Sequence, residues 1–377
     1  MSIHNIDNNI GLIQEEQEQI QQIQPIMNSS YTMRRSGDYY STFYGHRARY
    51  LKTLLTSLRQ IHTKKNNKPP TCIFLAGDSS LDNKAWLFDN LMQSSQALQY
   101  DYSHGKRYSA NCVNGYEQLL VEPKGMVKDI TYWLNYKLEK INETNQASNS
   151  DEPSYFALNT AVEATTLAER SGGCYMCCVA TCGRLLESDE VIRDHLTEND
   201  YLVVSLGGND IALAPSIFTV IFLILILLCP FFLLFKYNPI VYYFVILFKH
   251  QVKAYLNKVI KNKKPKKIGV CCIYYLDERN GESWANCALF CLCYCTCPSM
   301  LQYRIRKMFE LATSDIKIKG VEVIPIALSD ALDGKSTGDY VQRVEPSISG
   351  GQKMASLIIS KMFGMHNDTK VKEAYKD

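Results

Sequence analysis

Short apolar stretches recur along this chain and alternate with longer amphipathic ones. The apolar stretches are rich in β-branched and aromatic residues, as buried parallel strands are. They span residues 71–77, 154–159, 200–208, 267–276 and 320–328. The intervening segments are long enough for crossover helices, and residues 48–62, 189–199 and 301–314 have helical patterns. This alternation predicts an α/β fold, a doubly wound parallel sheet of about five strands with helices on both faces.

The sequence divides into a short polar segment and one long domain. Residues 1–35 are rich in Gln and Glu and predict a disordered polar tail. Residues 36–377 then form one domain, and 46% apolar content is enough for its core. The net charge of +3 is too small to indicate nucleic-acid binding by the whole chain. The N-terminus lacks a secretory pattern, and with fourteen Cys this favours a reducing compartment and free thiols.

Polar motifs follow two of the apolar runs. Gly77-Asp78-Ser79 ends the first run, and Gly207-Gly208-Asn209-Asp210 ends the third. In a doubly wound sheet, ligands bind at the carboxyl ends of the strands. We therefore expect Ser79, Glu163, which follows the second run, and Asn209 to converge at one end of the sheet.

The motifs resemble those of the SGNH (GDSL-like) hydrolase superfamily. Residues 77–79 resemble its block I and residues 207–210 its block III. Residues 159–166 resemble block II, and residues 338–358 stand where block V belongs, so the resemblance covers roughly residues 70–365. It implies a flavodoxin-like strand order of 2-1-3-4-5, with the runs counted from the N-terminus.

The resemblance also implies roles for individual residues. Ser79 would be the nucleophile that attacks an acyl carbonyl. The oxyanion would be held by the Asn209 side chain and by backbone N–H groups, those of Ser79, Gly208 and Glu163. The simpler interpretation is that Ser79 and Asn209 are turn or capping residues.

Two positions depart from the family pattern. Glu163 stands where block II has a glycine, and the Asp-x-x-His of block V is absent. Glu345 or Gln342 occupies the histidine position, depending on the alignment. Glu345 could act as the base and Asp339 could orient a partner, but a carboxylate base needs a raised pKa. The ending Glu345-Pro346-Ser347 resembles that of related protist proteins and implies a divergent, protist-type member.

Histidines elsewhere in the chain are weaker candidates for the base. His46 and His104 lie in polar segments outside the motifs, and His195 lies on the helix before the third run.

A hydrophobic insertion, residues 211–248, follows the third run. Its residues 217–235 form a charge-free stretch of nineteen residues, long enough for a transmembrane helix. The flanking strands share one sheet, so both ends of the insertion lie on the same side of a bilayer. A re-entrant or monotopic hairpin that turns near residues 236–239 therefore fits best. It should overhang the cleft; the alternative is a buried hairpin.

The segment after this turn is basic. Residues 236–267 contain nine Lys and no acidic residue. A basic run beside an apolar segment suits an anionic, cytoplasm-facing membrane surface. The sequence therefore predicts a membrane-associated protein on the cytoplasmic face.

The cysteines fall into two groups. Cys174, Cys177, Cys178 and Cys182 lie on one helical face, which favours apolar packing over metal binding. Cys291, Cys293, Cys295 and Cys297 alternate, a poor spacing for zinc, and S-palmitoylation is an alternative for them. We expect no metal and no cofactor.

Two functions fit these features. The first is a serine ester hydrolase, an esterase or lipase that acts on acyl esters at a membrane surface. The second is a catalytically inactive relative that binds lipid or serves as a structural membrane-associated subunit. A nucleotide-binding Rossmann domain fits poorly, because no G-x-G-x-x-G follows the first run.

Overall fold

A five-stranded parallel sheet forms the centre of the protein. The computed structural model describes residues 31–87, 109–121, 125–172, 183–229, 231–232 and 238–365. The strands are β2 (Thr71–Gly77), β6 (Tyr155–Asn159), β7 (Tyr201–Ser205), β8 (Lys267–Cys272) and β9 (Glu322–Ala327). All neighbours pair in parallel, in the order β6-β2-β7-β8-β9. This is the predicted order 2-1-3-4-5, and the α/β fold class is confirmed.

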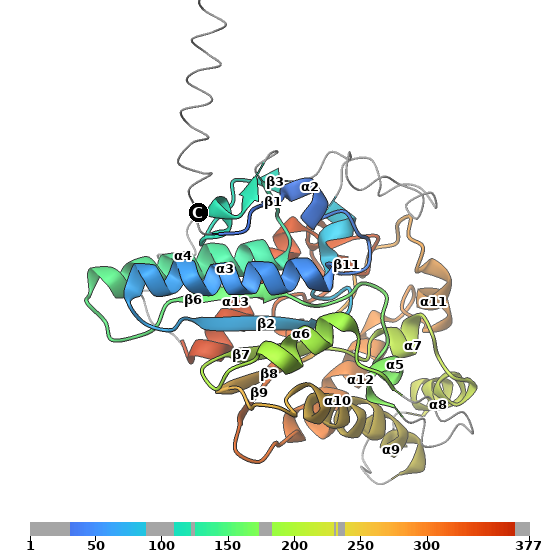
Figure 1. The fold of residues 1–377 in the computed structure, drawn as a ribbon. Helices are drawn as coiled ribbons and strands as arrows, with labels where there is room; N and C mark the ends of the chain where they lie inside the picture. Colours follow the sequence, from blue (N-terminus) through green and yellow to red (C-terminus); the bar gives the residue numbers. More distant parts are fainter. Residues whose placement is uncertain are drawn as a thin grey trace, which may run out of the picture.

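Helices cover both faces of the sheet (Figure 1). One face carries α3 (Ala48–Asn66), α6 (Glu187–His195) and α10 (Val252–Val259), and the other carries α4 (Ile130–Ala147) and α13 (Ile348–Phe363). Strand side chains alternate between these layers. In β2, Cys72, Phe74 and Ala76 join the first core, and Ile73 and Leu75 join the second.

Small elements complete the scaffold. The helical ones are α2 (Ser36–Tyr39), η1 (Asn83–Leu87), η3 (Tyr116–Gln118), α5 (Leu167–Ser171), α7 (Asn209–Ala212), α11 (Asn286–Cys291), α12 (Pro298–Leu311), η6 (Thr313–Asp315), η7 (Leu328–Asp330) and η8 (Thr337–Asp339). The short strands are β1 (Arg34–Arg35), β3 (Ser109–Ala110), β4 (Leu120–Val121), β5 (Met126–Val127), β10 (Tyr340–Val341) and β11 (Glu345–Pro346). Strand β1 pairs with β4, so regular structure begins inside the tail expected to end at residue 35.

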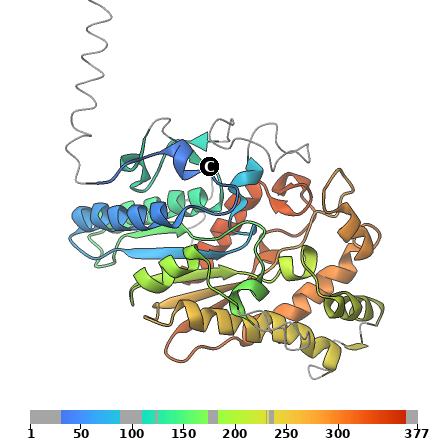
Figure 2. The same ribbon diagram turned by 45° about the vertical axis from the view of Figure 1, so that its right-hand side comes forward.

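The insertion forms a helical layer at the carboxyl end of the sheet (Figures 1 and 2). It contains α8 (Ile217–Leu228), α9 (Pro239–Val245) and the π-helical turn η5 (Ile246–Gln251), which continues into α10. The Thr219 and Tyr243 hydroxyls lie 2.6 Å apart and join α8 to α9. Of the expected turn, residues 236 and 237 lie outside the described residues, and Asn238 caps α9.

The length of α8 bears on the membrane expectation. Helix α8 covers the first twelve residues of the apolar stretch, Ile217–Leu228. In the described part of the chain, no helix is both long enough and apolar enough to cross a bilayer.

Much of the lysine run lies at the amino ends of the strands, whereas the two motifs follow the carboxyl ends. Lys261, Lys263, Lys264 and Lys266 directly precede β8, whose first residue is Lys267. They therefore lie at the amino ends of the strands, whereas Ser79 and Asn209 follow carboxyl ends. Lys249, nearer the insertion, pairs with Asp315 at 2.6 Å. These five lysines do not form a basic surface beside α8.

Candidate active site

Ser79 lies on a tight turn directly after β2. A Cβ atom on Gly77 would lie 2.3 Å from the Ser205 carbonyl oxygen, so only glycine allows this approach to β7. The Asp78 N–H then donates to the same carbonyl at 3.2 Å, and Asp78 Oδ1 accepts the Ser80 N–H at 3.1 Å. These bonds fix the backbone on both sides of Ser79.

The turn opens into a cleft of about 90 Å³. Ser79, Gly208, Asn209 and Glu345 all line it, although they come from three distant parts of the sequence. The rest of the lining includes Asp78, Phe248, Cys272, Tyr274, Leu276, Trp284, Leu289 and Leu292. The structure thus brings together four of the six candidate site residues.

Glu345 reaches Ser79 from the hairpin of β10 and β11. Glu345 is 4% exposed, and its carboxyl group lies close enough to the Ser79 side chain for that hydroxyl group to lower the pKa of Glu345. Among the described residues, Glu345 Oε2 has no hydrogen-bond partner. The glutamate at the block V position is therefore in contact with the candidate nucleophile.

Burial changes the acidity of Glu345. The pKa of Glu345 is raised from its ordinary value of 4.5 to about 8, first by desolvation and then by the nearby Asp78 and Asp82 carboxyls, while the Ser79 side chain acts in the opposite direction. Desolvation also raises the pKa of Asp78 to about 6. The Lys84 ammonium, 2.6 Å from Asp82, supplies a positive charge to this acidic cluster.

Three candidate oxyanion donors belong to residues that line the cleft. Asn209 uses one amide N–H to donate to the Thr165 carbonyl at 3.0 Å, which fixes its side chain and leaves the second N–H. Among the described residues, no backbone carbonyl accepts a hydrogen bond from the N–H groups of Ser79 and Gly208. All three residues line the cleft.

Glu163 is placed differently. Its backbone N–H donates to Asp82 Oδ2 at 2.9 Å, and Glu163 is not among the cleft-lining residues. Its side chain is 3% exposed, and burial together with the Glu345 carboxyl raises its pKa. The structure gives Glu163 a place in the acidic cluster and directs its N–H away from the oxyanion position.

Asp339 also lies apart from the cleft. Its carboxylate accepts hydrogen bonds of 2.5 Å from Lys353 and Ser349, both on α13. These bonds tie the loop before β10 to that helix. Asp339 is not among the residues that line the cleft. Its carboxylate is bonded to α13 and not to Glu345.

The other residues of the second motif support the site. The Asp210 carboxylate accepts the N–H groups of Leu167 and Ala168 at 2.7 and 2.9 Å, which caps α5. Gly207 has a φ of +107°, and a Cβ there would lie 2.8 Å from Phe248. The glycine thus lets the π-helical turn of the insertion approach the cleft.

Several site residues were not singled out from the sequence. Phe248 ends the apolar insertion and Tyr274 follows β8, so their position after the carboxyl ends of strands was the available signal. Trp284 lies in a loop without any pattern. Asp78 was visible only as part of the first motif.

The histidines lie away from this cleft or outside the described residues. His46 is buried, stacks on Tyr39 at 4.0 Å between ring centroids, and its Nδ1 lies 2.9 Å from the Tyr39 carbonyl. His195 ends α6, at the amino end of the sheet. His104 lies outside the described residues. Neither His46 nor His195 lines the cleft.

Only the second of the two cysteine groups lies among the described residues. Cys174, Cys177, Cys178 and Cys182 lie outside the described residues. Cys291 and Cys293 are exposed, Cys295 and Cys297 are partly buried, and all four are free thiols. Within the described part of the chain, no three His, Cys, Asp or Glu side chains are grouped as a metal ion would require.

Comparisons with known proteins show similarity in structure. No protein-family model matches the sequence, and no curated protein matches it. The carbohydrate acetylesterase Est24 from Sinorhizobium meliloti is 13% identical, with a TM-score of 0.39 over 78% of this chain and 100% of its own. The M. smegmatis aryl esterase is 10% identical, with a TM-score of 0.39 and the same coverage. An extracellular lipase from Streptomyces rimosus is 10% identical, with a TM-score of 0.37 over 77% and 99% of the two chains.

Proposed function

We propose that this protein is a serine ester hydrolase in which Ser79 is the nucleophile and Glu345 is the general base. The observation that carries the proposal is the position of the buried Glu345 carboxyl group next to Ser79, in a cleft that Asn209 also lines. A nucleophile in contact with a base, beside oxyanion donors, is the arrangement that acyl transfer requires.

The reaction follows from this arrangement. Ser79 Oγ attacks the ester carbonyl carbon as its proton moves to the Glu345 carboxylate. The carbonyl oxygen becomes an oxyanion, which accepts hydrogen bonds from Asn209 and from the N–H groups of Ser79 and Gly208. When the carbon–oxygen ester bond breaks, Glu345 returns the proton to the leaving alkoxide. A water molecule then attacks the acyl carbon as one of its protons moves to the Glu345 carboxylate. The bond between Ser79 Oγ and the acyl carbon breaks, Glu345 returns the proton to Ser79 Oγ, and the acyl group leaves as a carboxylic acid.

The buried position of Glu345 suits this role. A carboxylate with an ordinary pKa near 4.5 is a weak base toward a serine hydroxyl, and a general base works best when its pKa lies near the working pH. The raised pKa of Glu345, about 8, gives it the basicity that the absent imidazole would otherwise supply. At neutral pH most of the enzyme then carries a protonated Glu345, which limits the rate.

Serine-directed labelling tests the proposal. A fluorophosphonate should label the wild-type protein, and Ser79→Ala should abolish both labelling and hydrolysis of p-nitrophenyl butyrate. Ser80→Ala is the matched control, because Ser80 also lines the cleft but its hydroxyl lies 2.7 Å from Asp78 and 2.6 Å from Ser205. Labelling that survives in Ser79→Ala would overturn the assignment. Complete inertness of the folded wild-type protein would favour the inactive, lipid-binding alternative.

We further propose that the enzyme acts at a lipid surface, on the cytoplasmic face of a membrane. The support is the outer side of α8, where Ile217 is 67%, Ile224 47% and Leu228 77% exposed. Contiguous exposed apolar side chains are uncommon on proteins that contact only water, and they mark interaction sites. Leu223 and Ile226 of the same helix line a cavity that shares residues with the cleft, so the exposed side of α8 would place the bilayer surface near the site.

A further inference from the structure

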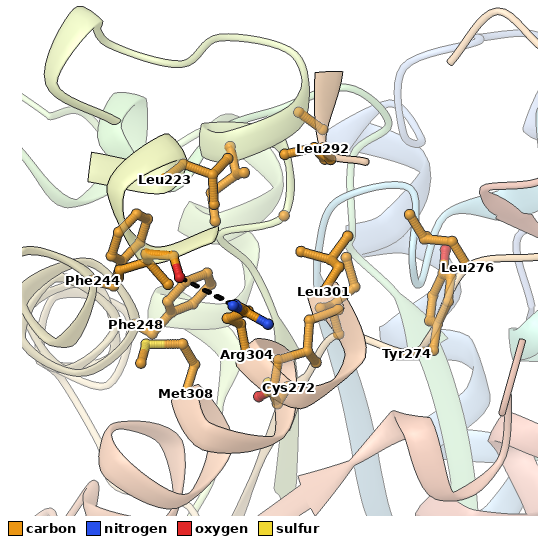
Figure 3. A pocket seen from close by; sticks show the side chains of 16 residues that line it. Leu223, Phe244, Phe248, Cys272, Tyr274, Leu276, Leu292, Leu301, Arg304 and Met308 are labelled. Carbon is orange, nitrogen blue, oxygen red and sulfur yellow. Dashed lines mark hydrogen bonds between the residues drawn. The ribbon is translucent and has the colours of Figure 1, made fainter. Parts of the chain in front are cut away.

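A second cavity, of about 110 Å³, adjoins the Ser79 cleft. Figure 3 shows the side chains that line it. Its lining is almost entirely apolar and comes from the insertion and from α12; it includes Leu223, Ile226, Phe244, Phe248, Leu301 and Met308. None of these groups has a role in the mechanism above.

The cavity and the cleft share one wall. Gly208, Phe248, Cys272, Tyr274, Leu276 and Leu292 are among the residues that line both. Gly208 is also one of the proposed oxyanion donors. An acyl carbonyl held at Gly208 would therefore have the apolar cavity directly beside it.

Arg304 is the one charged residue in the lining, and each of its three guanidinium nitrogens donates a hydrogen bond to a backbone carbonyl. Its guanidinium donates to the carbonyl oxygens of Ile226 and Leu227 at 3.0–3.3 Å, and Figure 3 shows it directed to this helix end. A further bond of 2.5 Å goes to the Met300 carbonyl. Helix ends carry unpaired carbonyl groups, so Arg304 caps α8 and joins it to α12. The Arg304 guanidinium is therefore hydrogen-bonded within the wall of the cavity, and the other lining side chains are mostly apolar.

We propose that this cavity holds the aliphatic chain of the substrate's acyl group, so that the enzyme prefers long acyl chains to acetyl. The inference rests on the proposed function and specifies its substrate. An apolar chain gains free energy with each methylene that it removes from water, whereas a polar group in such a cavity would lose its hydrogen bonds. The insertion is then the part of the chain that sets acyl specificity.

The same helix connects this cavity to the proposed lipid surface. Leu223 and Ile226 face the cavity, whereas Ile224 and Leu228 on the same turns of α8 are exposed. One helix thus contacts the bilayer with one side and the acyl chain with the other. The chain would pass from lipid into the cavity along an apolar path.

The test measures kcat/KM for p-nitrophenyl esters from acetate to decanoate. For the wild type, kcat/KM should rise about fourfold for each methylene until the cavity is full, the fold-change that corresponds to about 0.8 kcal/mol. Met308→Trp, which fills the cavity, should lower the octanoate-to-acetate ratio at least tenfold, and Leu223→Phe is a milder second variant. Tyr303→Trp is the matched control, because Tyr303 is 42% exposed on the same helix as Met308, and it should keep the wild-type ratio.

A binding measurement separates this inference from the proposed function. The methyl ester of cis-parinaric acid, an uncharged fluorescent chain, should bind the Ser79→Ala protein and bind at least tenfold more weakly once Met308→Trp is added. Chain binding without any hydrolysis by the wild type would refute the proposed function and retain the cavity as a chain site. Hydrolysis that shows no chain-length preference, together with no binding of the probe, would overturn the inference and leave the proposed function standing.

Discussion

The Asp82 carboxylate accepts the backbone N–H of Glu163 at 2.9 Å, and the same oxygen accepts the N–H of Gly45 at 2.9 Å. The resemblance to SGNH hydrolases implies that the N–H at position 163 is an oxyanion donor. In this protein that group instead holds together the loops that follow β2 and β6. In the proposed mechanism, oxyanion stabilisation would then depend on Asn209 and on the N–H groups of Ser79 and Gly208, which would make Asn209 more important than it would be beside a fourth donor.

Asn209→Ala should lower kcat for ester hydrolysis by about 10²- to 10³-fold, with a smaller change in KM. The reason is that an oxyanion donor acts mainly in the transition state, and loss of one such donor costs about this much. Steady-state kinetics on a soluble p-nitrophenyl ester measure the effect. The adjacent Asp210→Ala serves as a comparison, because Asp210 caps α5, and loss of a cap costs about 0.5–2 kcal/mol of stability. A rise in KM with an unchanged kcat for Asn209→Ala would contradict the oxyanion role.

The pH dependence of catalysis should identify the base. Glu345 has a pKa of about 8 in the folded protein and must be ionised to accept the Ser79 proton. The wild-type kcat/KM should therefore rise with pH and reach half its maximum near pH 8. Glu345→Gln should remove this ionisation together with at least a hundredfold of activity, since general bases contribute about 10²–10⁴-fold. A midpoint near 6.5 that survives in Glu345→Gln would place an imidazole at the site.

The acidic cluster should cost stability at high pH, and Glu163→Gln should reveal it. The folded-state pKa of Glu163 lies above its ordinary value of 4.5, so the folded protein keeps the proton over a range in which the unfolded chain releases it. The contribution of Glu163 to the free energy of unfolding is therefore fully present below pH 4.5, and it is lost as the pH rises toward the folded-state pKa. Glu163→Gln reduces this dependence and should raise Tm at pH 8 by about 1–2 °C, which corresponds to about 1 kcal/mol for a chain of this length. Thermal unfolding at pH 5 and pH 8 checks this, and the Tm difference between variant and wild type should be larger at pH 8.

The sheet was predictable because its information is local. Each strand is a short apolar run, and parallel strands with crossover helices allow few arrangements, so the observed order agrees with the expected one. The short strand at Arg34–Arg35 was not predictable, because two polar residues carry no periodic signal. The pairing of β1 with β4 depends on contacts across more than eighty residues of sequence.

The site was predictable where a motif follows a strand. Ser79, Gly208 and Asn209 meet because the ends of neighbouring strands meet. The hydrogen-bond partners of the site residues could not be predicted in the same way. Whether Glu163 presents its N–H to a substrate or to Asp82 depends on a loop conformation, and the spacing of residues does not encode it. The lysine run shows the same limit: its residues follow the insertion in sequence, but α10 carries the chain back to the far edge of the sheet.

The separation of lysines from α8 leads to the last prediction, which concerns how the protein binds membranes. If the outer side of α8 is the binding surface, Ile224→Lys combined with Leu228→Lys should weaken liposome binding at least tenfold. Full burial of one such side chain contributes about 1.5–3 kcal/mol, and about 1.4 kcal/mol corresponds to a factor of ten. Tyr44→Lys, at a side chain that is 56% exposed and distant in sequence, should leave binding unchanged. Binding carried by α8 should also persist in 0.5 M salt and on neutral phosphatidylcholine vesicles, because apolar contacts are not screened by ions. Flotation with liposomes of defined composition measures all of these. Binding that requires anionic lipid and is lost at high salt would instead assign the membrane contact to the lysines that precede β8.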